Sequence, residues 1–97
     1  MYEISDELYL KVAELLLFEI GHNDYFSGSV SLTEGDMVCK LTCTVMVGYG
    51  DREYDGSGFR PITRLTPIWW EFHTIEGCEE ILNDFSFNKM LELTFDR

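Results

Sequence analysis

The spacing of apolar residues in the first fifth of the chain predicts a helix. Apolar side chains recur there at intervals of three and four residues, which places them on one helical face: Leu8, Val12, Leu15 and Leu16. Ser5 is a typical N-cap residue and is followed by two acids, which the helix dipole favours in a first turn. Gly21 suits the left-handed residue that ends many helices. These signals predict a helix over about residues 5–20.

From Tyr25 onward the period changes to two. Apolar and polar residues alternate over residues 25–33 and again over 37–47, and Glu34-Gly35-Asp36 separates the two runs as a short turn. The pattern predicts an antiparallel hairpin with one buried face, which includes Leu41 and Val45, and one solvated face. Residues 48–58 are rich in glycine and have no apolar period, so we expect an exposed loop there.

A third extended segment is predicted over about residues 59–75. Residues Ile62, Ile68, Trp70 and Phe72 share one parity, which we expect to face the core. Pro61 and Pro67 cannot donate ladder hydrogen bonds, so this segment is either an edge strand in its first half or broken near Pro67.

The end of the chain is typical of a short strand followed by a helix. Gly77 suits a turn, and residues 78–82 follow it as a possible fourth strand. Asp84 or Ser86 is a suitable cap for a last helix, whose apolar residues are Phe87, Met90, Leu91 and Phe95. The chain of 97 residues therefore predicts a single α+β domain: a three- or four-stranded antiparallel meander with an N-terminal and a short C-terminal helix packed on one face.

The charge of the chain restricts its partners. Eighteen acidic residues against seven basic ones give a net charge of −11, which disfavours direct binding to nucleic acid or to anionic lipid. The sequence shows no apolar run long enough to span a membrane and no signal-peptide pattern, so we expect a cytoplasmic protein with no membrane contact. Cys39 and Cys43 lie in one predicted strand, about 13 Å apart, which is too far for a disulfide between them.

One loop has part of a calcium-binding pattern. Asp51, Glu53 and Asp55 alternate ahead of Gly56, and Ser57 follows, so that oxygen atoms can converge on a cation. An EF-hand loop also requires a bidentate Glu at its twelfth position, where this chain has Ile62. The alternative is a solvated acidic loop without a metal.

The pair Trp69-Trp70 suggests a docking surface. Adjacent side chains in a strand point to opposite faces, so one indole is exposed unless both faces of the sheet are covered. With Trp70 in the core, we expect Trp69 on the other face with Leu65, Pro67 and Tyr54, as an aromatic patch for a protein partner. The alternative is that one of the helices covers this face.

No arrangement of residues indicates catalysis. A cysteine nucleophile with His73 as its base is the nearest approach, but no nucleophile elbow, phosphate loop or metal-ligand spacing accompanies these residues. We therefore predict that the chain is not an enzyme and that it holds no cofactor other than, in the calcium hypothesis, a metal in the acidic loop.

Four segments carry a resemblance to a known group of proteins. They are Asp55-Gly56-Ser57-Gly58, the strand Pro67-Ile68-Trp69-Trp70-Glu71-Phe72, Glu76-Gly77 and Asp84-Phe85-Ser86. Over about half of its length the chain resembles small acidic α+β proteins of uncharacterised function from gut anaerobic bacteria and their mobile elements. The resemblance implies a bacterial origin and transfers no activity or site residue.

Three functional hypotheses follow from the sequence. The first is a small non-enzymatic accessory or protein-binding domain that acts through a sheet face or edge, with an unknown protein or a second copy as its partner. The second is a mimic of DNA that inhibits a nucleic-acid-binding protein, which requires the acidic side chains to cluster. The third is a calcium-binding module built on the loop 51–57.

Overall fold

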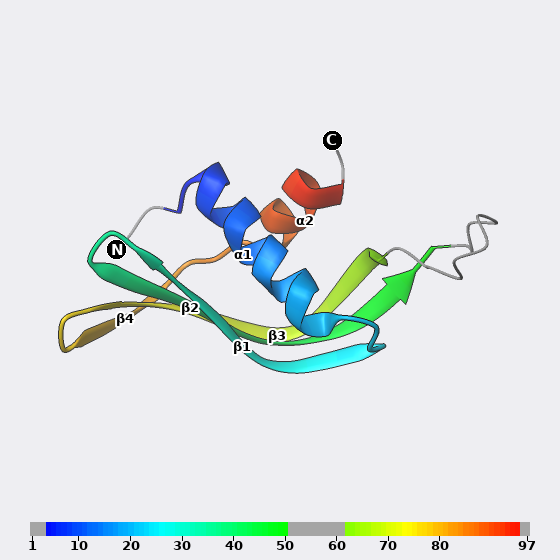
Figure 1. Cartoon of the computed structure of the whole chain (residues 1–97), viewed down its shortest axis with the longest axis horizontal. Helices are drawn as coiled ribbons and strands as arrows, with labels where there is room; N and C mark the ends of the chain where they lie inside the picture. Colours follow the sequence, from blue (N-terminus) through cyan, green and yellow to red (C-terminus); the bar gives the residue numbers. More distant parts are fainter. Residues whose placement is uncertain (1–3, 51–61, 96–97) are drawn as a thin grey trace.

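Two layers make up the fold, a four-stranded sheet and a pair of helices. The computed structural model describes residues 4–50 and 62–95. The elements follow in the order α1 (Asp6–Ile20), β1 (Tyr25–Glu34), β2 (Met37–Tyr49), β3 (Ile62–Glu76), β4 (Glu79–Asn83) and α2 (Phe87–Phe95). Both helices lie on the same side of the sheet (Figure 1). The predicted α+β class and the antiparallel meander are confirmed.

The sheet has the simplest antiparallel order, β1-β2-β3-β4. Gly35 and Gly77 form the tight turns of the two hairpins, and each has a φ of 63°, in the left-handed region that favours glycine. β4 pairs only with residues 72–76 of β3, so the outer edge of the first part of β3 has no neighbouring strand among the described residues.

Hydrogen bonds at the helix ends explain where the helices begin and end. The Ser5 hydroxyl accepts a bond from the Leu8 N–H at 3.1 Å, and the Gly21 N–H donates to the Leu17 carbonyl at 3.2 Å. Of the two residues predicted to cap the last helix, Ser86 is the cap. Its hydroxyl accepts a hydrogen bond from the backbone N–H of Lys89 at 3.1 Å.

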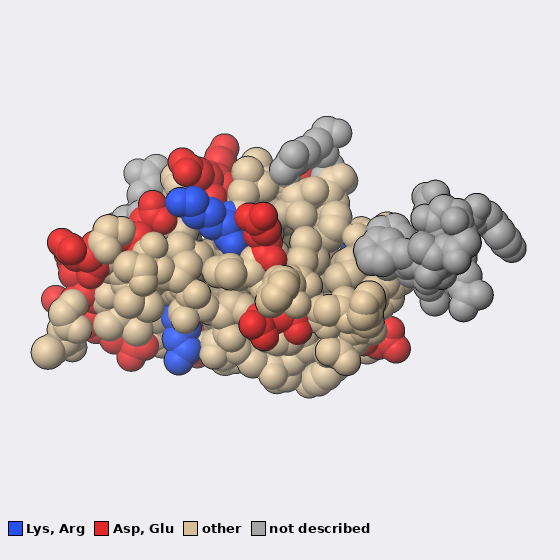
Figure 2. Space-filling model, viewed as in Figure 1, with Lys and Arg blue, Asp and Glu red and all other residues tan. Residues whose placement is uncertain are grey.

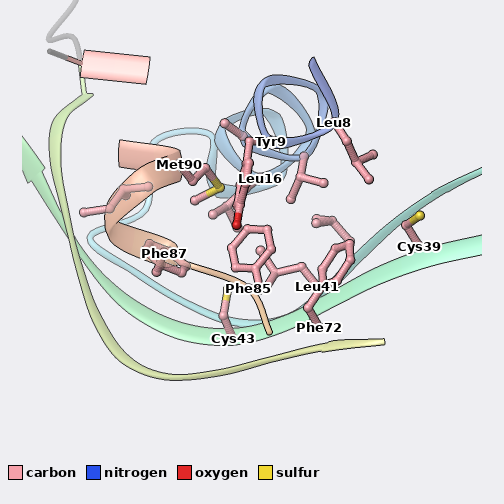
Figure 3. Close-up of a cluster of buried hydrophobic side chains, with 14 of the residues drawn as sticks. Leu8, Tyr9, Leu16, Cys39, Leu41, Cys43, Phe72, Phe85, Phe87 and Met90 are labelled. Carbon is pink, nitrogen blue, oxygen red and sulfur yellow. The ribbon is translucent and has the colours of Figure 1, made fainter. Parts of the chain in front are cut away.

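The core lies between the helices and the sheet (Figure 3). Phe85, from the segment between β4 and α2, stacks on Phe72 of β3 and contacts Tyr9 of α1, with 4.9 Å between ring centroids in both cases. Tyr9 also accepts a hydrogen bond from the Ser86 N–H at 3.1 Å. Tyr9 and Phe85 therefore fasten α1 to the start of α2 and to the sheet.

A β-bulge in β3 changes which of its residues face the core. The pairing shifts between Thr44 and Val45, so that Thr44 faces Trp69 while Val45 faces Pro67, and Ile68 is the extra residue. Of the two alternatives for this segment, an edge strand in its first half is the one found: β3 runs without a break from Ile62 to Glu76, and β4 pairs only with residues 72–76. The prediction that Ile68 shares the buried face with Phe72 is wrong: Ile68 is 61% exposed, because as the extra residue of the bulge it no longer follows the alternation that leads to Phe72.

Candidate functional site

One face of the sheet is open among the described residues. α1 and α2 pack on the face that carries Leu41, Val45 and Phe72, all of which are buried as expected. No described helix lies on the opposite side (Figure 1). We call that side the open face. Among the described residues, therefore, no helix covers the face that carries Trp69, contrary to the alternative given above.

Four apolar residues gather at one end of the open face. They are Tyr25, Met46, Ile68 and Trp69, which are 51%, 48%, 61% and 47% exposed. Tyr25 of β1 pairs directly with Met46 of β2, and Trp69 of β3 pairs with Thr44, two residues before Met46 and on the same face. Residues at such diagonal positions lie about 7–8 Å apart, within reach of large side chains. These four residues are called the open-face patch below.

Trp69 is the only member of the patch among the docking residues expected from the sequence. Leu65 is 4% exposed and belongs to the core, which corrects its expected place beside Trp69. Pro67 pairs with the buried Val45 and is half-buried on the helix side. The bulge explains both differences, since Leu65 and Pro67 precede Ile68. Tyr54 lies outside the described residues.

Sequence reasoning missed Tyr25, Met46 and Ile68 as patch residues. For Tyr25 and Met46 a signal was present: both occupy the parity that is polar elsewhere in the hairpin, where Ser27 and Thr44 follow the polar pattern. Two large apolar residues at cross-strand positions on a solvated face indicate a contact surface. For Ile68 no comparable signal existed, because its exposure depends on the position of the bulge.

Trp70 lies on the helix side but is not enclosed there. Its indole N–H donates to the Phe85 carbonyl oxygen at 2.9 Å, and its ring contacts Phe87 with 5.5 Å between centroids. It remains 38% exposed, because β4 does not extend this far along β3. The prediction thus placed Trp70 on the correct face of the sheet but overestimated how deeply it is buried.

Farther along the open face, His73 lies within hydrogen-bonding distance of two carboxylates. Its Nδ1 lies 3.1 Å from the Glu80 carboxylate and its Nε2 lies 3.1 Å from that of Glu71. Both ring nitrogens are therefore engaged. Cys39 and Cys43 are buried on the opposite face of the sheet, so neither forms a nucleophile and base pair with His73.

Burial also makes the two core thiols poor nucleophiles. Loss of hydration raises the pKa of the Cys43 thiol to about 11. The pKa of Cys39 is raised first by burial and then by the negative charge of Glu34. A thiol with a raised pKa carries little thiolate at neutral pH, and thiolate is the reactive form. Their role in this fold is that of small core residues, as the sequence indicated.

Acidic side chains gather at the end of the sheet that carries the two hairpin turns (Figure 2). Five of them come from these turns and the adjoining strand ends: Glu34, Asp36, Glu76, Glu79 and Glu80. Lys11 of α1 reaches this end and lies 3.5 Å from the Glu34 carboxylate. The open-face patch lies toward the other end of β2 and β3. These five acids thus lie away from the patch along the sheet.

The calcium hypothesis concerns residues outside the described part of the chain. Asp51, Glu53, Asp55 and Ser57 all belong to the segment 51–61, which the structure does not describe. Within residues 4–50 and 62–95, no group of three or more acidic, histidine or cysteine side chains is arranged to hold a metal ion. In the same residues, no helix is both long and apolar enough to cross a membrane.

Comparison of the chain with protein-family models, with curated proteins and with solved structures finds no match in any of the three. The resemblance to small acidic proteins of gut anaerobes therefore stays a prediction.

Proposed function

We propose that this chain is a non-enzymatic accessory domain that binds a protein through the open-face patch. The observation that supports the proposal is the position of Trp69, half-exposed beside Ile68 and next to Met46 on a sheet face that no other described element covers. Aromatic residues and methionine are enriched in the centres of protein interfaces, and truncation of a central tryptophan often weakens binding strongly.

The partner we propose is a protein surface with apolar residues at its centre and basic residues around them. Covering the patch removes apolar area from water, which is the main favourable term in most protein associations. Asp24 directly precedes Tyr25, and Glu71 follows Trp69 on the same face, so the patch has carboxylates at its border. Together with the net charge of −11, these carboxylates favour a basic rim on the partner and disfavour an acidic one.

A photo-crosslinking residue in place of Met46 tests the proposal, used in cells that naturally express the chain. We expect a covalent adduct with one protein. Trp69→Ser should reduce the yield of that adduct strongly, since loss of a central tryptophan weakens binding by about 2 kcal/mol or more, roughly thirtyfold.

Leu82→Ser provides the matched control. Leu82 is 59% exposed and lies on the open face beside His73, toward the acidic end of the sheet. The variant should therefore leave the adduct unchanged. An adduct whose yield is insensitive to Trp69→Ser, or equally reduced by both variants, contradicts binding through the open-face patch.

The two other hypotheses stay predictions with separate tests. A mimic of DNA would use the acidic end of the sheet, so replacing Glu76, Glu79 and Glu80 by glutamine should abolish inhibition of its target while Trp69→Ser has no effect. A calcium-binding module should show a higher melting temperature in about 1–5 mM calcium, a concentration well above the dissociation constants of most calcium sites.

A further inference from the structure

The outer edge of β1 presents a row of backbone groups without partners among the described residues. The Val47 N–H donates to the Asp24 carbonyl at 2.9 Å, so Asp24 and Val47 form a hydrogen-bonded pair. The next pair along the ladder, Tyr25 and Met46, is therefore not hydrogen-bonded. Hydrogen-bonded pairs alternate along an antiparallel ladder, so every second residue of β1 points its N–H and C=O away from β2. The outward residues are Tyr25, Ser27, Ser29, Ser31 and Thr33.

The residues of β1 itself have none of the features by which natural proteins protect an edge strand. β1 spans ten residues, pairs with β2 without a register shift, and contains no proline or lysine. No residue from Tyr25 to Thr33 is charged, although the whole chain carries a net charge of −11. A long, regular, uncharged edge readily pairs with another strand.

We propose that β1 pairs with β1 of a second copy, in antiparallel orientation, to make a homodimer with one continuous eight-stranded sheet. A two-fold axis perpendicular to the sheet, midway between Ser29 of one copy and Ser29 of the other, places these two residues opposite each other. It also places Ser27 opposite Ser31 and Tyr25 opposite Thr33. This register engages all five outward residues with each other.

Side chains on both faces of β1 suit this pairing. On the open face the central positions are serines, which are too short to obstruct a neighbouring strand. On the helix side Phe26 and Leu32 pack against the core but stay partly exposed, and the two-fold axis brings each of them opposite the other. Pairing therefore covers apolar area that the single chain leaves at its edge.

Phe18 adds a second, independent indication that this edge is covered. It is 82% exposed, the most exposed of the large apolar residues described. Helical spacing places Phe18 on the same stripe of α1 as Lys11, whose amino group lies 3.5 Å from the Glu34 carboxylate at the end of β1. The exposed ring thus lies on the side of α1 that is next to β1, where a second copy would approach.

Charge makes the proposed dimer sensitive to salt in the direction opposite to that of a basic partner. The two-fold axis brings Asp24 opposite Glu34 of the second copy at each end of the paired strands, and both copies carry the same net charge. Salt screens this repulsion, so the dimer should strengthen when salt rises from about 0.05 M to about 0.5 M. A basic peptide added to the same edge would instead bind more weakly at high salt.

Sedimentation velocity of the full chain at about 0.5 mM, a concentration that populates even a weak dimer, tests the proposal. We expect a species of twice 11.3 kDa. Ser29→Pro removes an outward N–H without breaking a bond to β2, and should weaken dimerisation roughly tenfold or more. Ser29→Ala keeps the N–H and should leave dimerisation unchanged. Circular dichroism verifies that each variant is folded.

A pair of charge variants tests the register and keeps the proposal falsifiable if Ser29→Pro fails to fold. The double variant Ser27→Lys with Ser31→Lys places like charges opposite each other across the two-fold axis and should weaken the dimer. Ser27→Lys with Ser31→Glu places opposite charges there and should restore it.

Two results would overturn the inference. One is a monomer at this concentration at both salt concentrations. The other is a dimer that Ser29→Pro leaves intact and Trp69→Ser dissociates, which would assign the contact to the open-face patch. The inference does not rest on the proposed function, since β1 pairing leaves both open faces free and on the same side of the dimer.

Discussion

Trp70 donates its indole N–H to the carbonyl oxygen of Phe85, over 2.9 Å and across fifteen residues of sequence. The bond ties the outer edge of β3 to the segment that leads into α2, at a point beyond the residues of β3 that pair with β4. Trp69, its neighbour in sequence, pairs with Thr44 and remains on the open face. Two adjacent tryptophans thus have different tasks, one in stability and one in the proposed binding.

Replacement of each tryptophan by phenylalanine should therefore have different effects on stability. Trp70→Phe leaves the Phe85 carbonyl without its donor and should lower the free energy of unfolding by roughly 1–2 kcal/mol. Trp69→Phe changes an exposed side chain and should stay within about 0.5 kcal/mol of the parent. Urea denaturation followed by circular dichroism measures both. Equal losses would contradict the separation of tasks.

A second prediction concerns the buried polar pair Asn83 and Thr74. The Asn83 side-chain amide donates to the Thr74 hydroxyl at 2.7 Å and to the Ile81 carbonyl at 3.0 Å. Asn83→Ala leaves two acceptors without this donor and should reduce the free energy of unfolding by roughly 1–3 kcal/mol.

The double-mutant cycle isolates the contact between these two side chains. Thr74→Val removes the acceptor while the bond from Asn83 to Ile81 remains. If the two side chains interact as described, the double variant should lose less stability than the two single variants added together. Strict additivity in chemical denaturation would show that the hydrogen bond contributes nothing measurable.

The third prediction follows from the core thiol of Cys43, whose pKa burial raises to about 11 from its usual 9.0. The folded state therefore holds this proton more tightly than the unfolded state does. Stability from this source is complete below pH 9 and falls as the pH rises from about 9 to 11, because only the unfolded chain ionises readily in that range. The difference corresponds to roughly 2–3 kcal/mol, and Cys39, whose pKa is also raised, acts in the same direction.

Denaturation curves between pH 8 and pH 11 measure this loss, and Cys43→Ala provides the control. The variant starts less stable because it leaves a small cavity, but its stability should decline less steeply over this range. Parallel curves for the parent and Cys43→Ala would contradict the assignment of the alkaline loss to this thiol.

Much of the fold could be predicted from local patterns. The helix over residues 5–20, the hairpin with Leu41 and Val45 inward and the capping by Ser86 all depend on periods of 3.6 or 2 and on side chains that bond to nearby backbone. Interactions of this kind act over a few residues, so the order of residues contains the information needed to recognise them.

The candidate site could be predicted less well from such local patterns. Ile68, Trp69 and Leu65 lie within five residues of one another, and a count of parity put Ile68 in the core and Leu65 outside, the reverse of what is found. The error has a single cause, the extra residue at Ile68, because a shift of one position moves the side chains before it to the opposite face, as far as the second register shift near Ile62.

The sequence by itself determined the class of the fold, the order of its elements, the inward face of the hairpin and the charge that any partner must accept. Only the tertiary structure decided where the bulge in β3 falls, and that among the described residues no strand pairs with the outer edge of β1. The physical reason is one of range. Periodicity and capping are set by neighbours along the chain, whereas register and the covering of faces are set by contacts between strands and helices that are distant in sequence.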